Sequence, residues 1–412
     1  MRIIDVRNRR AVRRLVAPES REDRALERRV RSIVGGVKKG GDRALVRFTR
    51  RFDGVSPPLE ITADQMRAAA DRVDPAVRRA IARAAQHIAR VAFRQIPRHW
   101  DLDVRPGVSI EQRVEPLASV GCYVPGGRFP LPSSLLMTAV PARVAGVRTV
   151  VVCCPKPDDV VMAAAVEAGV TRLFRVGGAH AIAALAFGTA TVPRVDKIVG
   201  PGNRYVAAAK AMVAGHCAID FYAGPTEIAI VAGSGPAAWI AADLVAQAEH
   251  DPDARSVFIT WSRSLAKQVL AATKRMSAGR PIASRSLARH GAVALARTAD
   301  EAMDLANLLA PEHLVVDREA LANRPLTAGA VFIGPYSAQA AGDYATGSNH
   351  VLPTASAARF RGGLSAADFM RVMSVQRLTR EGLEALAPII LPLARAEGLV
   401  AHAESIEIRL RR

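Results

Sequence analysis

The sequence predicts an α/β protein with two Rossmann-like parallel-sheet domains and with helical segments at its N-terminal and C-terminal ends. Short β-branched runs alternate with helical patterns, an order typical of βαβ units whose helices cover a parallel sheet. Upstream of this alternation the apolar residues follow the helical period, which changes to the period of a strand at residues 108–114. The strands predicted within the alternation are residues 149–152, 173–176, 197–199, 228–231, 257–260, 292–296, 314–316 and 330–333.

Residues 1–107 are predicted to form a helical region, and we expect this region to pack against the second α/β domain. Residues 20–23 match a capping box, a pattern that commonly opens a helix. Thr62 with Gln65 forms a second capping box, and an Asp-Pro step at residue 74 predicts the start of a longer helix.

The chain divides again at two later points. A run of Gly, Ser and Pro within residues 232–236 predicts a link between two sets of βαβ units. From Thr379 onward the pattern is helical, with interruptions predicted at Pro388 and Pro392. The predicted boundaries are 1–107 for the helical region, 108–232 for the first α/β domain, 233–378 for the second, and 379–412 for the C-terminal segment.

The composition predicts an ordinary globular protein that buries a sizeable core. Of its 412 residues, 50% are hydrophobic and 23% are charged. The first residues lack the pattern of a signal peptide, and no apolar run is long enough to span a membrane, so we expect a cytoplasmic protein without a membrane partner. The formal charge is +19, but aromatic residues make up only 5% of the chain and do not interleave with a basic stripe. We therefore expect no nucleic-acid partner.

A possible metal-binding pair lies at the end of a predicted helix. Gln247 and His250 are three residues apart, which places an amide oxygen and an imidazole nitrogen on one face of the helix. Such a pair suits a divalent metal, although the same spacing is common at solvated helix ends. Two ligands do not complete a site, so the remaining ligands must come from elsewhere in the chain.

Two glycine-rich loops are candidates for binding a phosphate or a ribose. Residues 121–127 are rich in turn residues and precede a predicted helix start at 131–134. Residues 200–205 begin like a dinucleotide-binding fingerprint after a strand, but Tyr205 replaces the third glycine. Taken alone, each loop is also compatible with a simple structural turn.

Three further segments combine carboxylates with histidines. Glu312 and His313 are adjacent, which suits acid–base chemistry. Asp343 and His350 share a glycine-punctuated loop, and a third segment runs from Glu397 to His402. Each histidine taken individually is more often a structural one, and it is their joint occurrence that favours an active site.

These motifs together resemble the histidinol dehydrogenase family. The resemblance extends over nearly the whole chain, and the set of motifs is highly specific. It rests on residues 121–127 with 131–134, 177–181, 200–203, 223–227, 247–250, 311–314, 342–354 and 397–402.

The resemblance implies an NAD-dependent zinc enzyme that oxidises L-histidinol to L-histidine in two hydride transfers through an enzyme-held aldehyde. It also implies one Zn²⁺ per subunit and a homodimer with interlocked C-terminal segments, because the last zinc ligand reaches in from the other subunit. The implied zinc ligands are Gln247, His250, Asp343 and His402.

The resemblance assigns roles to the other motif residues as well. Glu312 and His313 match the acid–base pair. The implied NAD-binding residues are Tyr123, His180 and Asn203. The implied substrate-binding residues are Thr226, Gln247, His250, His313, Asp343, His350, Glu397 and His402.

This chain departs from the family pattern at three positions, two of them among the residues just named. His180 stands where glutamine is common, and Thr226 stands where serine is common. Gln339 stands where glutamate is common, and we expect the lost charge to weaken histidinol binding, so that a Gln339→Glu change lowers KM with little effect on kcat.

Two other functions compete with this one. A dehydrogenase of the same fold could act on another small polar alcohol, such as a sulfonated diol, and would keep the metal and NAD residues. A basic protein with an inactive site could instead bind a polyanion. The complete metal and acid–base sets argue against the second alternative.

Overall fold

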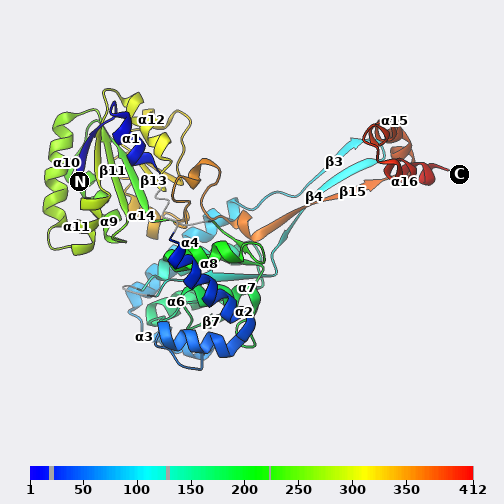
Figure 1. The fold of residues 1–412 in the computed structure, drawn as a ribbon, viewed down its shortest axis with the longest axis horizontal. Coiled ribbons are helices and arrows are strands. Elements are labelled where there is room, and N and C mark those ends of the chain that lie inside the picture. The colour runs from blue at the N-terminus through cyan, green and yellow to red at the C-terminus, as the bar shows by residue number, and fades with distance from the viewer. Residues whose placement is uncertain (18–22, 127–129, 222–223, 412) are drawn as a thin grey trace.

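A computed structural model describes residues 1–17, 23–126, 130–221 and 224–411. It contains two α/β units and a long arm that ends in the C-terminal helices (Figure 1). The α/β class with parallel sheets predicted from the sequence is confirmed. The capping signal at Ser20 lies outside the described residues. Within the described part of the chain, every helix is too short or too polar to cross a membrane.

The first unit is a six-stranded sheet covered by helices on both faces. Its strand order is β2-β7-β6-β5-β8-β9, and all neighbours are parallel except β2 and β7. The strands are β2 (Glu60–Ile61), β5 (Ser119–Tyr123), β6 (Thr149–Cys153), β7 (Arg172–Phe174), β8 (Lys197–Val199) and β9 (Ala218–Ile219). The crossover helices are α5 (Pro132–Val144), α6 (Asp159–Glu167), α7 (Gly178–Phe187) and α8 (Arg204–Val213).

The N-terminal helices add an outer layer to this first unit. Helix α2 (Arg24–Phe52) packs against α7 and α8, α3 (Ala63–Arg72) packs against α6, and α4 (Pro75–Arg94) packs against α5. The expectation that the whole N-terminal region packs against the second unit is therefore wrong for these three helices. Among the N-terminal elements that the structure describes, β1 (Arg2–Asp5) and α1 (Arg9–Val16) join the second unit. Helix α4 also touches the second unit, where His87 Nδ1 lies 2.6 Å from the Ala345 carbonyl oxygen. Helical periodicity identifies an apolar face, but it does not identify the sheet that buries this face.

Local helix signals in this region are confirmed where the structure describes them. Thr62 and Gln65 form a reciprocal capping box at the start of α3, and Asp74 caps α4 with Pro75 in its first turn. Helix α2 starts after Asp23, which accepts a hydrogen bond from a backbone amide of the first turn.

The second unit is a six-stranded parallel sheet. Its strand order is β1-β12-β11-β10-β13-β14. Its further strands are β10 (Glu227–Val231), β11 (Arg255–Thr260), β12 (Ala292–Leu295), β13 (His313–Val316) and β14 (Ala330–Ile333). Its further helices are α9 (Ala237–Glu249), α10 (Arg263–Ser277), α11 (Pro281–Arg289), α12 (Ala299–Leu309), α13 (Glu319–Ala322) and α14 (Gln339–Tyr344).

The boundary predicted after residue 232 needs correction. Strand β10 pairs with β11 and β13, so it belongs to the second sheet, and the chain changes units before residue 227. The Gly-rich stretch at 232–236 is the loop from β10 to α9 within one βαβ unit. Such a loop has the same turn composition as a link between domains, which explains the error.

The arm is a three-stranded antiparallel sheet with two helices at its end. Its strands are β3 (Trp100–Arg105), β4 (Val108–Pro116) and β15 (Met370–Leu378), with β4 in the centre. The strand predicted at residue 108 therefore belongs to the arm, and β5 is the first strand of the chain that pairs in parallel within the first sheet. Two short 3-10 helices, η1 (Ala357–Arg359) and η2 (Ala366–Phe369), precede β15.

The C-terminal helices α15 (Arg380–Ala396) and α16 (Val400–Leu410) pack against each other at the far end of this arm (Figure 1). Helix α15 continues through Pro388 and Pro392, so the predicted interruptions are wrong. Each proline removes one backbone hydrogen bond, and the rest of the turn is retained.

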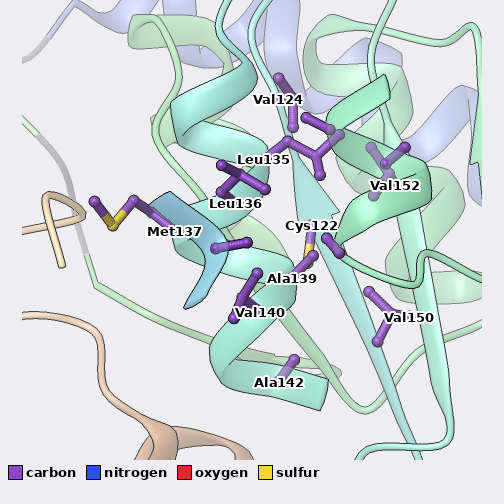
Figure 2. Packing of buried hydrophobic residues seen from close by; sticks show 14 of the residues in the cluster. Cys122, Val124, Leu135, Leu136, Met137, Ala139, Val140, Ala142, Val150 and Val152 are labelled. Carbon is purple, nitrogen blue, oxygen red and sulfur yellow. The ribbon is translucent and has the colours of Figure 1, made fainter. Parts of the chain in front are cut away.

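The core around α5 fixes one end of the first sheet. Figure 2 shows apolar side chains gathered between α5 and the strands β5 and β6, including Leu135, Leu136, Cys122 and Val150. These side chains are almost fully buried. Burying each leucine contributes about 1.5–3 kcal/mol, so this layer holds the carboxyl end of β5 in a fixed position.

Candidate active site

A buried cluster of polar side chains lies at the amino ends of β10 and β13 in the second sheet. Thr226 precedes β10, and Glu312 precedes β13. The Thr226 hydroxyl donates to Glu312 Oε2 at 2.5 Å, and the Glu227 amide donates to the same oxygen at 2.9 Å. Gln247, from the last turn of α9, donates through its amide to the Thr226 hydroxyl. Parallel pairing of β10 and β13 therefore brings residues 226 and 312 together.

Glu312 and His313 lie side by side in this cluster and are both buried. His313 Nδ1 is 3.8 Å from Glu312 Oε2 and 3.3 Å from the Glu227 carbonyl oxygen. Burial raises the pKa of Glu312 to about 8, and it lowers the pKa of His313. The imidazole is therefore neutral at pH 7 and able to accept a proton.

Helix α14 and the loop after it supply the other wall of the cluster. Asp343 Oδ1 is 4.0 Å from His313 Nε2 and 3.9 Å from His350 Nδ1. Gln339 is buried, donates to Asp343 Oδ2 at 2.6 Å, and lies 3.4 Å from His313 Nε2. Burial lowers the pKa of His350, and the neighbouring Asp343 opposes this effect. His250 is among the groups that act electrostatically on His350. His250 therefore lies within electrostatic range of the cluster.

The amide oxygen of Gln247 has an unusual environment. This residue is fully buried, and its Oε1 atom finds no hydrogen-bond partner among the described residues. An unsatisfied buried carbonyl oxygen costs roughly 1–3 kcal/mol unless a ligand or an ion satisfies it. Within the described part of one chain, no three His, Cys, Asp or Glu side chains are close enough together to hold a metal.

Two predicted site residues do not reach the cluster within their own chain. Glu397 follows α15, and His402 lies in α16. Both side chains are exposed, and both belong to the helices at the end of the arm, away from the second unit (Figure 1).

The predicted cofactor residues all lie at the carboxyl edge of the first sheet. Tyr123 ends β5, His180 lies in the first turn of α7 after β7, and Asn203 follows β8. The carboxyl edge is where ligands bind in open α/β sheets. The Tyr123 hydroxyl accepts a hydrogen bond from the Gly178 amide at 3.1 Å, and Asn203 caps α8.

His180 is oriented differently from the other two residues. Its ring is buried, and Nε2 lies 2.8 Å from Asp53 Oδ2. The Gly177 amide donates to the same carboxylate oxygen at 3.0 Å. In this structure His180 therefore contacts the end of α2, a position to which the sequence patterns assigned no role.

Glu227 is a site residue that the sequence patterns did not identify. It is buried, its amide and carbonyl groups contact Glu312 and His313, and burial raises the pKa of its side chain to about 7. It lies at the end of the motif 223–227, and its further sequence signal is a carboxylate at the head of an otherwise apolar strand, where a charged side chain is uncommon.

The two Rossmann-like sheets and this buried acid–imidazole cluster together define an α/β enzyme. The family model for histidinol dehydrogenase matches residues 17–410. The chain is 45% identical over 395 residues to a histidinol dehydrogenase from Methanothermobacter thermautotrophicus, covering 93% of each chain. It is 44% identical over 418 residues to one from Bordetella parapertussis, covering 97% of this chain and 94% of that protein.

A solved structure gives the same result. The crystal structure of histidinol dehydrogenase from Elizabethkingia anophelis has a TM-score of 0.95 and 31% identity, covering 100% of this chain and 98% of that chain. The chain therefore belongs to the histidinol dehydrogenase family, and it is an oxidoreductase.

Proposed function

We propose that this enzyme carries out the NAD-dependent and zinc-dependent oxidation of L-histidinol to L-histidine through L-histidinal, in cytoplasmic histidine biosynthesis. The observation that carries the proposal is the buried cluster in which Glu312 and His313 lie beside Asp343. Its neutral imidazole can accept a proton at neutral pH, and its carboxyl group becomes a base as the pH rises toward about 8.

The cluster supplies part of the proposed zinc site. The proposed ligands are Gln247, His250, Asp343 and His402, a set of nitrogen and oxygen donors that suits Zn²⁺ or a similar first-row ion. The unpartnered Oε1 atom of Gln247 supports this set, because a cation would satisfy that oxygen. When bound, the metal would hold polar atoms of the substrate and orient the reacting carbon.

The chain's own groups can provide the proton transfers of both oxidations. Tyr123, Asn203 and the turn that carries His180 would hold NAD, which would supply the hydride acceptor for each oxidation. His313 would take the proton of the alcohol in the first oxidation. Glu312 would activate the water that adds to the aldehyde before the second oxidation.

We further propose a homodimer in which each C-terminal segment completes the site of the partner subunit. His402 and Glu397 lie at the end of an arm that exposes many apolar side chains, a pattern that favours a protein interface. Glu397 would pair with the ammonium group of the substrate. Apolar residues more than half exposed on the arm and its helices are Leu102, Val104, Val372, Ile389, Leu393, Val400 and Ile408.

A stoichiometric assay tests the proposed reaction. The zinc-loaded protein should form about two NADH per L-histidinol, because conversion of an alcohol to an acid releases four electrons. L-histidine should accumulate in half the molar amount of NADH. If histidinol gives no NADH while a sulfonated diol or another small polar alcohol does, the substrate assignment is wrong and the same-fold alternative is correct.

Replacing Gln339 with glutamate should destabilise the metal-free protein more than the zinc-loaded protein. The new carboxylate would face Asp343, whose Oδ2 now accepts a hydrogen bond from the Gln339 amide. Losing this bond and burying a second carboxylate should cost about 1–3 kcal/mol in the free energy of unfolding, and a bound cation should offset the repulsion.

Urea unfolding of the Gln339→Glu protein with a chelator and with zinc measures this difference. Equal destabilisation in both conditions would show that Asp343 does not face a metal. The same protein, when zinc-loaded, also tests the expected decrease in KM for histidinol.

A further inference from the structure

A fully buried ion pair lies directly beneath the proposed cofactor edge of the first sheet. Lys210 of α8 and Asp220, which follows β9, form the pair, and their side chains are 2% and 1% exposed. Neither residue belongs to the acid–base cluster or to the proposed metal ligands. Because lysine and aspartate are rarely buried so completely, this pair requires an explanation.

The ion pair holds both backbone groups of Gly200. Asp220 Oδ2 accepts a hydrogen bond from the Gly200 amide at 2.8 Å, and Lys210 Nζ donates to the Gly200 carbonyl oxygen at 3.0 Å. The other Asp220 oxygen accepts from Lys210 and from the Phe221 amide. Two charged side chains therefore fix a single peptide segment at the end of β8.

Gly200 connects this pair to two of the proposed cofactor residues. Its φ angle is 113°, and a Cβ atom at this position would lie 2.2 Å from the Tyr123 carbonyl oxygen. Three residues later, Asn203 caps α8. A displacement of Gly200 would therefore shift the loop that contacts the Tyr123 backbone and carries Asn203.

Stability alone does not account for the pair. Desolvating two charges costs several kcal/mol per ion, and apolar side chains of similar volume often replace such pairs without loss of stability. We propose that Lys210 and Asp220 are positioning residues that fix the Gly200 loop in the conformation that binds NAD. This inference rests on the proposed NAD dependence, and it adds two residues that act on the cofactor through the backbone of Gly200.

Lys210→Met tests the proposal, with Lys197→Met as a matched control. Lys197 is also largely buried and ion-paired, but it lies at the opposite end of β8, and its hydrogen bonds go to Asp368. In an NADH fluorescence titration without substrate, Lys210→Met should weaken NADH binding by at least about tenfold, since losing a charge-assisted hydrogen bond that holds the binding loop corresponds to a change of about this size. Lys197→Met should bind NADH like the wild type.

The kinetics should separate in the same way. In Lys210→Met, the KM for NAD should rise over the wild-type value by at least the same factor as the dissociation constant of NADH. The KM for histidinol should stay within about twofold of the wild-type value. NADH affinity and KM for NAD that match those of Lys197→Met would overturn the proposal.

A double variant separates positioning from charge balance. Lys210→Met with Asp220→Leu leaves no unpaired buried charge, so its melting temperature should exceed that of Lys210→Met alone. Its NADH affinity should stay low, because the Gly200 amide and carbonyl have lost their partners. If the double variant recovers both NADH affinity and melting temperature, Lys210 and Asp220 have a purely structural role. Wild-type protein that binds NADH but does not oxidise histidinol would disprove the proposed reaction and leave this inference intact.

Discussion

Mixing two inactive variants should restore about one quarter of wild-type activity, the largest gain expected of any experiment on this protein. His402→Ala should lower turnover more than about a hundredfold, because even an outer partner of a metal ligand contributes 10–100-fold. His313→Ala should lower turnover by about 10²–10⁴-fold, because it removes the proposed general base. In a mixed dimer, the subunit that retains His313 would receive an intact His402 from its partner. Random pairing makes half of the dimers mixed, and each mixed dimer has one complete site of two, so about one quarter of all sites are active.

The mixing experiment requires unfolding and refolding the two variants together, followed by an assay of NADH formation. His402→Ala refolded with itself, and His313→Ala refolded with itself, are the controls for recovered activity. Separation of differently tagged subunits establishes that mixed dimers formed. Mixed dimers without activity would show that each chain supplies its own fourth ligand, contrary to the proposed exchange.

Glu312→Gln should slow the second oxidation by about 10²–10⁴-fold and leave the first within about tenfold of wild type, because only the second step needs an activated water. Glutamine keeps an oxygen that can accept from the Thr226 hydroxyl and the Glu227 amide, so the local structure should persist. Separate assays with histidinol and histidinal, each under single-turnover conditions, measure the two steps.

His313→Ala is the matched comparison for Glu312→Gln, because His313 is adjacent to Glu312 and is also buried. Replacing His313 should slow the oxidation of the alcohol itself. The wild-type rate of the second step should also rise with pH through about 8, the pKa to which burial raises Glu312, because only the ionised carboxylate is a base. This pH dependence should be absent from Glu312→Gln. Equal losses in both oxidations would mean that Glu312 orients groups and does not activate water.

Local features were the part of the fold that could be predicted from the sequence. The β-branched runs became strands β6 to β8 and β10 to β14, and Thr62 and Asp74 cap helices as expected. The allocation of elements to sheets could not be predicted. Strand β10 and helices α2 to α4 have ordinary patterns that fit either unit, and only long-range packing decides between the two sheets.

In the candidate site, too, local motifs could be predicted from the sequence and long-range contacts could not. The adjacent pair of Glu312 and His313 was evident as a motif, and the parallel register of β10 and β13 adds Thr226 to it. The role of Glu227 could not be predicted, because it depends on the depth of burial and on backbone contacts with the next strand. The rotation of His180 toward Asp53 depends on a residue that is 127 positions distant in the chain.

The arm has a consequence for how the enzyme responds to dilution. Strand β4 alone has nine residues and is about 30 Å long at 3.3 Å per residue, so it carries α15 and α16 well beyond the units that fold around the two large sheets. If each site takes its last metal ligand from this distant end of the partner, a lone subunit can be fully folded and still be inactive. Specific activity then becomes a property of the dimerisation equilibrium and falls as the protein concentration approaches the dimer dissociation constant.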